Sequence, residues 1–317
     1  MCKVSKKRFG AIVAGITMAA TLVSSANAAI VYSVDFDSAT SDGTIQGVTG
    51  GTATIATTSN RTTIETSPTF GPEGNRFLRT ISPVNNAQNP QAVQVANLAP
   101  SAGNSLSVLT TQIGGQRVMK GGFDFFLRSD IAVNGTTTSV NTLRVIDAGS
   151  SSGNGARLIV NSDSGSQDTA LQVDVITSGG ALKVRAPEAF TIAANTLYHV
   201  AVLYTNDGAA GNTTGHLFIV EGNTAIDTSD LTSSNPALRG TTSINFTNEA
   251  SSFSVPNFNF GKVNTTSNER LQDFDAFRLY DATPSTFAAI TAVPEPTVVA
   301  LAGVGLAMLA LRRRPNA

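Results

Sequence analysis

The hydrophobic residues between the two ends of this chain recur in short runs, which either alternate with polar residues or stand unbroken between turns. Runs of this length are typical of β-strands, and the apolar spacing of an amphipathic helix is almost absent. The pattern predicts strands at Ile30 to Phe36, Ala92 to Val95, Phe123 to Leu127, Leu143 to Ile146, Leu158 to Val160, Leu171 to Ile176, Leu197 to Tyr204, His216 to Val220, Phe253 to Phe260 and Phe274 to Tyr280.

Turn residues separate these runs. Gly, Asn and Asp supply the positive φ angles and Asx turns that tight connections need. They cluster at Asp42-Gly43, Gly50-Gly51, Asn134-Gly135, Gly149 to Gly155, Gly179-Gly180 and Asn206 to Gly208. Many short strands joined in this way predict an all-β fold, a β-sandwich or jelly roll. We expect helix only at the two ends of the chain and over Ser285 to Ile290.

Residues 1–28 have the pattern of a secretory signal peptide. Basic residues precede an apolar segment from Phe9 to Val23, and the small residues Ala26 and Ala28 then form a cleavage site. We expect cleavage after Ala28 and export of the remainder. A retained N-terminal anchor is the alternative.

The chain ends in three consecutive parts, which are Pro294-Glu295-Pro296, an uncharged apolar run from Thr297 to Leu311, and Arg312-Arg313-Arg314. The prolines end the preceding fold, and as a helix the apolar run would be roughly 22 Å long, against about 30 Å of bilayer hydrocarbon. The arginines favour the cytoplasmic side of a membrane. We therefore expect a C-terminal transmembrane helix, with the residues before Pro294 outside the cytoplasm.

These three parts, in this order, resemble the PEP-CTERM sorting signal of exported bacterial proteins. The resemblance covers about residues 293 to 314, and we assign residues 293–317 to this sorting segment. It implies a protein held in the inner membrane until an exosortase, a membrane-embedded processing enzyme, acts near the Pro-Glu-Pro motif. The product would then lie on the cell surface or outside the cell. A plain single-pass anchor with a proline spacer is the alternative.

The segment between the two signals is acidic. The whole chain has a formal net charge of −1, but residues 29 to 293 alone carry −7. Such a surface repels phosphate backbones, which argues against a nucleic-acid partner. The only cysteine, Cys2, lies in the signal peptide, so residues 29–292 contain no disulfide. We expect these residues to form one β-sandwich passenger domain.

Three segments of the passenger resemble laminin-G-like, concanavalin A-like sandwich domains. The sequence from Leu197 to Val202 and the strand from His216 to Val220 resemble the central hairpin of that fold, although the usual tryptophan is missing. Leu271 to Asp281 resembles its closing strand, and Lys120 to Arg128 resembles another of its strands. The resemblance extends over Ile30 to Ala292 and implies the same jelly-roll architecture.

Four aspartates form a candidate metal site. If the first and last strands pair, Asp35 and Asp37 approach Asp273 and Asp275, and like charges that close repel unless a cation lies between them. Calcium prefers such oxygen ligands. We therefore consider a structural Ca²⁺ at these aspartates, with solvated strand carboxylates as the alternative that we favour.

The sequence contains no recognisable catalytic motif. Sandwich glycosidases use paired carboxylates on one strand, and no Glu-x-Asp-x-Glu pattern occurs here. His199 and His216 are the only histidines. We interpret His199 as a structural residue on one sheet face and His216 as a turn residue. We expect no catalytic residues and a protein that is not an enzyme.

The sequence thus indicates where the protein is sent more clearly than what it binds or catalyses. The leading hypothesis is a non-enzymatic surface or extracellular-matrix protein, with a structural or adhesive module that contacts exopolysaccharide or neighbouring proteins. The first alternative is a carbohydrate-binding, lectin-like module. The second is a polysaccharide-degrading enzyme, which the scarcity of catalytic groups makes the weakest of the three.

Overall fold

The computed structural model describes residues 28–39, 45–55, 62–66, 76–82, 96–100, 109–130, 143–147, 172–177, 180–186, 190–246, 258–263 and 270–290. Every regular element in these residues is a β-strand, which confirms the all-β prediction. The expected signal and transmembrane helices lie outside the described residues. No helix within them is long and apolar enough to cross a membrane.

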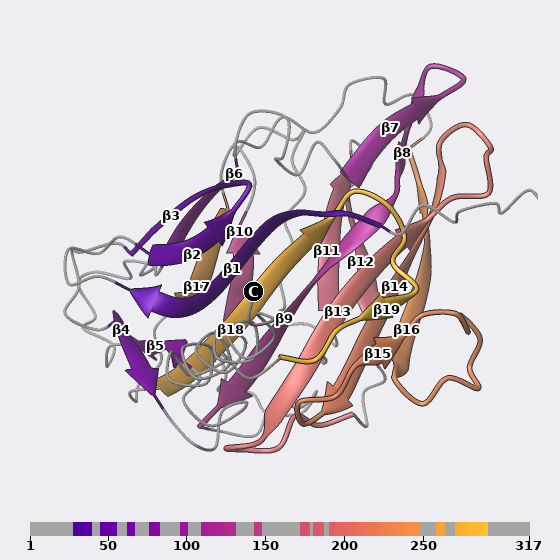
Figure 1. Cartoon of the computed structure of the whole chain (residues 1–317). Helices are drawn as coiled ribbons and strands as arrows, with labels where there is room; N and C mark the ends of the chain where they lie inside the picture. The colour runs from indigo at the N-terminus through magenta and orange to yellow at the C-terminus, as the bar shows by residue number, and fades with distance from the viewer. Residues whose placement is uncertain are drawn as a thin grey trace, which may run out of the picture.

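A nine-stranded antiparallel sheet dominates the molecule (Figure 1). Its main strands run in the order β16-β14-β13-β9-β18-β1-β2, with β5 beside β18 and β4 beside β5. Their bounds are β1 Ile30–Ala39, β2 Ile45–Thr49, β4 Thr62–Thr66, β5 Arg76–Ser82, β9 Gly121–Ser129, β13 Leu197–Thr205, β14 Asn212–Glu221, β16 Leu238–Asn245 and β18 Arg270–Tyr280.

The first and last long strands of the described chain pair, as the sequence suggested. Strand β1 lies antiparallel to the C-terminal half of β18, with Val34 opposite Phe277, while β5 pairs with the N-terminal half. On its other edge β18 pairs with β9. Strand β18 is therefore enclosed on both sides, in the middle of the sheet. The expected hairpin of β13 and β14 is also present, with Val200 opposite Ile219.

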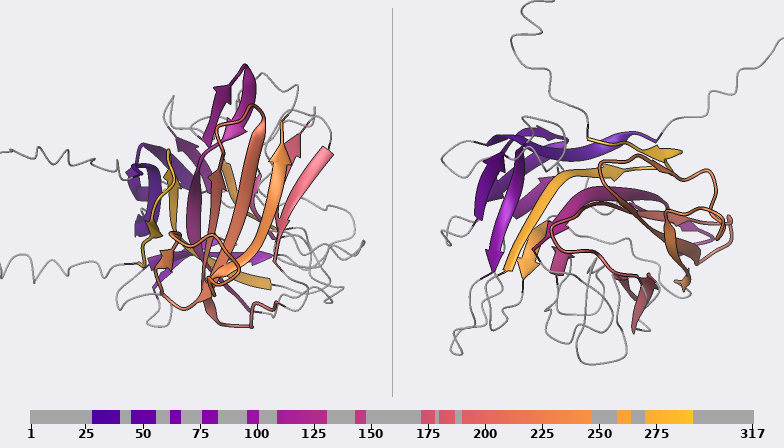
Figure 2. Two further views of the ribbon diagram at one scale, coloured as in Figure 1. Left: turned by 90° about the vertical axis from the view of Figure 1, so that its right-hand side faces the viewer. Right: turned by 90° about the horizontal axis from the view of Figure 1, so that it is seen from below.

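Smaller sheets complete the molecule, and the views in Figure 2 show them packed around the curved main sheet. One has four strands in the order β10-β17-β6-β3, and the others are the pairs β11–β12, β15–β19 and β7–β8. Their bounds are β3 Gly51–Ile55, β6 Ala96–Pro100, β7 Thr110–Ile113, β8 Gln116–Met119, β10 Leu143–Asp147, β11 Gln172–Thr177, β12 Gly180–Arg185, β15 Ile226–Asp227, β17 Phe258–Val263 and β19 Thr286–Phe287.

The central strands β9 and β13 of the main sheet are buried on both faces, but the two faces differ in chemistry. Side chains alternate across a strand, so one face of β9 and β13 carries Phe123, Phe125, Val200 and Val202, all buried; we name it the core face. On that side the Tyr32 hydroxyl donates to the Thr52 carbonyl of β3 at 3.0 Å, which joins two sheets.

The opposite face, which we name the ionic face, carries Asp124 and His199 on β9 and β13 and Arg278 on β18. The segment after β18, residues 281–290, crosses this face in front of β13 and β14 (Figure 1), and we name it the strap. We expected helix over Ser285 to Ile290, and that prediction is wrong. The strap is extended because β19 pairs with β15 and buries Phe287 against Tyr280.

Candidate functional site

The predicted sorting residues lie outside the described part of the chain. These are Ala26 of the cleavage site, Pro294, Glu295 and Pro296, and Arg312, Arg313 and Arg314. Ala28, the other cleavage residue, is described and packs partly against the cluster that contains Phe287. The sorting assignments stay predictions.

Asp273, one of the four candidate calcium ligands, is bound by two arginines. Arg79 of β5 donates to both of its carboxylate oxygens, at 2.8 and 3.0 Å, and Arg128 of β9 donates to Oδ2 from Nε at 2.9 Å and also from a terminal nitrogen. Both guanidinium groups also pack over the ring of Phe77, at 5.2 and 5.6 Å from its centroid. Arginine therefore already supplies the positive charge that this carboxylate needs.

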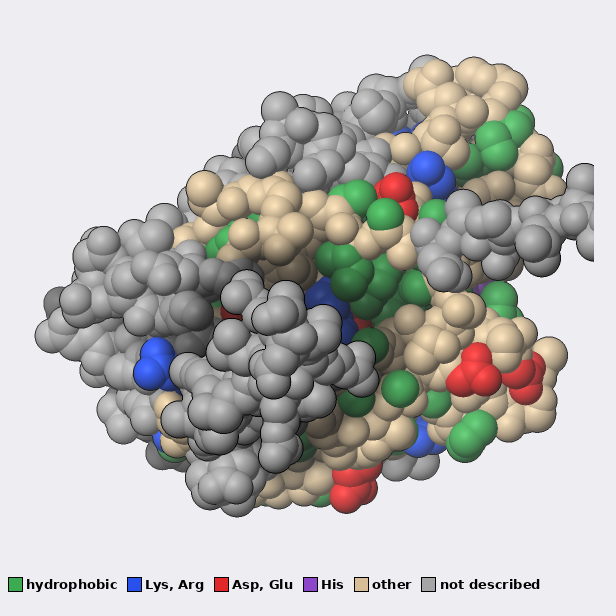
Figure 3. All heavy atoms as spheres, in the orientation of Figure 1, with side chains coloured by type: hydrophobic (Ala, Val, Ile, Leu, Met, Phe, Trp, Pro, Cys, Tyr) green, Lys and Arg blue, Asp and Glu red, His purple; other side chains and the backbone are tan. Residues whose placement is uncertain are grey.

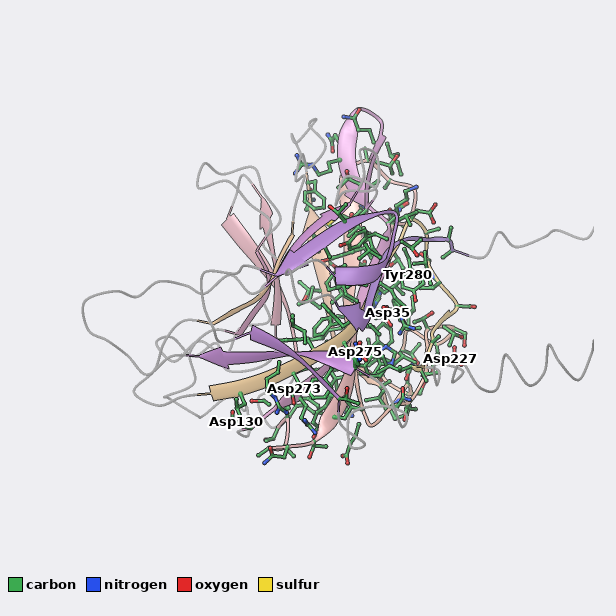
Figure 4. All side chains as sticks on the ribbon, turned by 60° about the vertical axis from the view of Figure 1, so that its left-hand side comes forward. Asp35, Asp130, Asp227, Asp273, Asp275 and Tyr280 are labelled. Carbon is green, nitrogen blue, oxygen red and sulfur yellow. The ribbon has the colours of Figure 1, made fainter. Side chains whose placement is uncertain are left out.

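The other three candidate ligands, Asp35, Asp37 and Asp275, do not form a metal site with Asp273 among the described residues. Asp275 is buried and its Oδ1 accepts the Ala276 backbone N–H at 2.7 Å, whereas Asp35 is exposed. Figure 4 labels Asp35, which belongs to β1, and Asp273 and Asp275, which belong to β18. The side chain of Asp37 lies outside the described residues, and the described ones contain no group of three or more His, Cys, Asp or Glu that could hold a metal. The calcium site stays a prediction.

A second buried network on the ionic face centres on Asp124 and His199. His199 Nε2 donates to Asp124 Oδ2 at 2.7 Å, and neither side chain is exposed. His199 Nδ1 lies 2.7 Å from the Thr224 carbonyl oxygen, and the imidazole stacks on Phe126 at 4.1 Å between centroids. Each ring nitrogen of His199 thus faces an oxygen atom of a neighbouring residue. The interpretation of His199 as a structural residue agrees with this geometry.

Arg278 completes the network from β18. Its Nε donates to Asp124 Oδ1 at 3.0 Å, and a terminal nitrogen donates both to Asp124 Oδ2 and to the Ala288 carbonyl of the strap. Burial lowers the pKa of Arg278, but the negative charges of Asp124 and Asp275 outweigh it and raise that pKa overall. The guanidinium therefore stays charged and holds the strap to the sheet.

A β-bulge makes this network possible. Asp275 lies opposite Phe126 and Arg278 lies opposite Asp124, so three steps along β18 match two steps along β9. The bulge residue Ala276 has a positive φ of 49°. Without the extra residue, Asp275 and Arg278 would point to opposite faces.

His216 also differs from the sequence-based interpretation. It is a buried residue of β14 and not a turn residue, because the strand begins four positions earlier, at Asn212. Its Nε2 lies 3.1 Å from Thr205 Oγ1 and its Nδ1 lies 3.2 Å from Thr241 Oγ1. Burial lowers the pKa of His216, so the ring is neutral at pH 7.

An open pocket lies at the end of the sheet where β14 and β16 meet the loop of residues 222–237. Its volume is about 600 Å³, and its lining combines acidic, amide, hydroxyl and guanidinium groups with small apolar side chains. It is lined by Val220, Glu221, Thr224, Ala225, Asp227, Asp230, Ser234, Asn235, Pro236, Ala237 and Arg239. Figure 3 shows acidic side chains at the surface near β15 and β16. The volume is in the range of about 300–1,000 Å³ that is usual for ligand pockets.

Hydrogen bonds within the loop fix the wall of this pocket. Asn235 is buried and donates to the carbonyls of Asp227 and Asp230, each at 2.9 Å, while its Oδ1 accepts the Ala237 N–H at 3.0 Å. The Asp230 carboxylate accepts bonds from Thr232 and Ser234. These bonds lower the pKa of Asp230, and the Ser229 backbone N–H lowers that of Asp227, so both carboxylates are ionised.

Several contacts hold the loop to the body of the protein, and the pairing of β15 with β19 is one of them. On one side His199 bonds to the Thr224 carbonyl. On the other, Asn223 bonds to both backbone groups of Ile290, accepting its N–H at 2.7 Å and donating to its carbonyl at 2.9 Å. The neighbouring loop residues Asn223 and Thr224 thus contact the strap and the buried ionic network, respectively.

The pocket offers hydrogen-bonding groups that are not used up by the fold. Among the described residues, the Glu221 carboxylate has no bonding partner, whereas the Asp227 carboxylate is bonded to Ser229. Arg239 donates from Nε to the Ile219 carbonyl at 3.2 Å and packs over Phe190 at 4.7 Å, which orients its guanidinium. Sequence reasoning missed this site, although the run Asp227 to Asn235 is rich in Asp, Ser and Thr.

No family model matches the sequence, and no curated protein is significantly similar to it. Among solved structures, the binding domain of Paraclostridial Mosquitocidal Protein 1 is 11% identical over 87% of this chain and 51% of that one, with a TM-score of 0.47. The binding domain of botulinum neurotoxin DC, in complex with SialylT, is 9% identical over 88% and 51%, with a TM-score of 0.43. The chain spans about half the length of these structures, and the similarity is too low to assign it to their fold family.

Proposed function

We propose that this protein is an exported, non-catalytic binding protein of the cell surface or extracellular matrix, and that it adheres through the pocket of the loop 222–237. The observation that carries the proposal is the pocket itself. It is open, has a size suited to a ligand, and keeps unused polar groups on a wall that internal hydrogen bonds fix in place.

The lining favours a ligand rich in hydroxyl groups. Carboxylates such as Glu221 and Asp227 accept hydrogen bonds from hydroxyls, the Arg239 guanidinium donates them, and Val220 and Ala237 add apolar surface. Three acids against one arginine disfavour an anionic ligand. We therefore propose a neutral exopolysaccharide as the partner, which makes the module lectin-like in its chemistry. Nucleic acid does not suit this pocket.

The buried state of the most reactive side chains supports a non-catalytic role. Asp124 and His199 would be the natural acid–base pair, but neither is exposed and both are bonded within the network. Asp273 is engaged by two arginines. A general acid or base must reach its substrate. These buried groups are therefore better suited to stabilising the fold than to catalysis.

Export and sorting belong to the same proposal. The signal peptide of residues 1–28 would direct the passenger, residues 29–292, across the inner membrane. The PEP-CTERM segment would hold it there through its apolar helix until an exosortase processes the tail. The finer fold assignment, a concanavalin A-like jelly roll, is also proposed on the sequence resemblance, and the extensive antiparallel sheet is compatible with it.

The experiment is a binding assay with the protein as the bacterium exports it. Intact mass of the membrane and extracellular fractions shows whether the product begins at Ala29 and ends near Pro294. The extracellular form is then sedimented with the polysaccharide of the producing cells, alongside the double variant Glu221→Gln and Asp227→Asn. We expect the wild type to sediment with the polysaccharide and the variant to lose at least tenfold in affinity. Equal sedimentation of both proteins would contradict a role for the pocket.

A further inference from the structure

The first residue after the predicted cleavage site is bound to the strap. The Ala29 N–H donates to Asp281 Oδ1 at 3.1 Å, and the Asp281 N–H donates to the Ala29 carbonyl at 3.3 Å. The next pair along the chain, Ile30 and Tyr280, belongs to the ladder between β1 and β18. Ala29 therefore lies at the end of that ladder, with its nitrogen against a carboxylate.

Cleavage after Ala28 would change the chemistry of this contact. Hydrolysis consumes one water. The carbonyl carbon of Ala28 gains the hydroxyl and leaves with the signal peptide as a carboxylate, and the nitrogen of Ala29 gains the hydrogen and becomes an amine. That amine is protonated below its pKa, which is about 7.7–8.0 for a free N-terminus. An amide donor is thereby replaced by a positive charge at the same position.

We infer that removal of the signal peptide creates an ion pair between the new N-terminal ammonium of Ala29 and the carboxylate of Asp281. The inference rests on the export signal of the proposed function but not on the pocket. The pair needs no rearrangement, because the nitrogen and Oδ1 are already within hydrogen-bonding distance. The carboxylate favours the charged amine and raises its pKa.

The position of Asp281 gives the ion pair a structural role. Asp281 begins the strap, which pairs with β15 through β19 and ends at Ile290 on the Asn223 side chain. The strap leads toward the sorting segment that begins at residue 293. Processing at the N-terminal end would therefore strengthen the hold on the segment that precedes the C-terminal signal.

The pair also predicts a pH dependence with a definite sign. The amine has a higher pKa in the folded than in the unfolded protein, so the stabilisation is fully present below about pH 8. It is lost as pH rises through the raised pKa. Because the contact is exposed and cleavage also removes the packing of Ala28, the amine pKa is a better readout than total stability.

The test uses exported protein, whose N-terminus is first identified by mass spectrometry. The α-amine is then titrated by its rate of acylation as a function of pH, in the wild type and in Asp281→Asn. Asparagine keeps an oxygen acceptor but removes the charge. Asp207→Asn, at an exposed turn, is the control for the change in net charge.

We expect a product that starts at Ala29 and an amine pKa at least half a unit higher in the wild type and in Asp207→Asn than in Asp281→Asn. A product that starts elsewhere would overturn the inference together with the predicted cleavage site. A product that starts at Ala29 with the same amine pKa in all three proteins would overturn the ion pair alone. Neither outcome bears on ligand binding in the pocket.

Discussion

His199 and Asp124, on neighbouring strands of the main sheet, share a 2.7 Å hydrogen bond from which water is excluded. Through its second nitrogen, His199 reaches the Thr224 carbonyl in the pocket loop. A fully buried pair in the sheet thus fixes the position of a surface loop. The buried network therefore contributes to the shape of the pocket.

Asp124→Asn should be strongly destabilising. Asparagine has the same shape but no charge, so His199 and Arg278 lose the carboxylate between them. Breaking a buried ionic network in this way costs about 3–5 kcal/mol. Guanidinium unfolding measures the loss, and Asp207→Asn, which removes an exposed carboxylate, should change stability by less than about 0.5 kcal/mol. Equal, small effects would mean that the network is not an essential part of the core.

Asp273→Asn should cost more than Arg79→Gln. The carboxylate binds two arginines at once, so its removal breaks the ion pairs with both Arg79 and Arg128. Loss of Arg79 alone leaves the contact between Arg128 and Asp273 intact. We expect about 2 kcal/mol for the aspartate and less than half of that for the arginine, since Arg79 is partly exposed. Urea unfolding of the two variants gives the ranking, and the reverse order would refute it.

Two buried tyrosines should respond in opposite ways to the same substitution. The Tyr204 hydroxyl has no hydrogen-bond partner among the described residues, whereas the Tyr32 hydroxyl bonds to the Thr52 carbonyl. Tyr204→Phe removes an unsatisfied polar group and should stabilise the protein by about 1 kcal/mol. Tyr32→Phe should destabilise it by a similar amount. Thermal melts of both variants provide the comparison, and a loss for Tyr204→Phe would reveal a partner for its hydroxyl.

His216 should make the protein less stable at mildly acidic pH. Burial lowers its pKa in the folded state from the ordinary value of 6.5. As pH falls below about 6.5, the unfolded chain therefore takes up a proton that the folded one resists, and stability declines. The decline between pH 7.5 and 5.5 should be smaller in His216→Gln than in the wild type. Parallel stability curves for wild type and variant would rule this out.

Asn235→Asp should loosen the pocket loop. The new carboxylate would face the carbonyls of Asp227 and Asp230, where the amide now donates two hydrogen bonds. We expect faster hydrogen exchange at the amides of residues 226–237, a loss of about 2 kcal/mol in stability, and weaker polysaccharide binding. Ser233→Ala, on an exposed loop position outside the pocket lining, is the matched control. Unchanged exchange in Asn235→Asp would show that the loop does not depend on this side chain.

Apolar runs predicted the interior strands well, because burial on both faces leaves a strong pattern. Phe123 to Leu127, Leu197 to Tyr204 and Phe274 to Tyr280 became β9, β13 and β18. The edge strands β4 and β16 were missed, since Thr, Ser and Gly dominate them and their hydrophobic alternation is weak. The helix expected near Phe287 failed because that side chain is buried through strand pairing with β15.

The ion pairs could not be predicted from local sequence patterns. Arg79 and Arg128 lie 194 and 145 positions from Asp273, so only the strand order brings them together. Arg278 would face away from Asp124 under strict alternation, and the bulge at Ala276 reverses that. The sequence analysis identified Asp273 as a candidate ligand but did not identify the two arginines that bind it.

The strap also determines how the protein would carry mechanical load. A pull on the chain beyond Ile290 acts first on the two hydrogen bonds of the Asn223 side chain, and next on the guanidinium of Arg278 at Ala288. Beyond these lie the pairing of β19 with β15 and then β18, which is held along both edges by β9, β5 and β1. To unfold the sheet, tension would have to shear these ladders along their length. The few contacts of the strap would therefore break first, and they could re-form while the sheet stays folded.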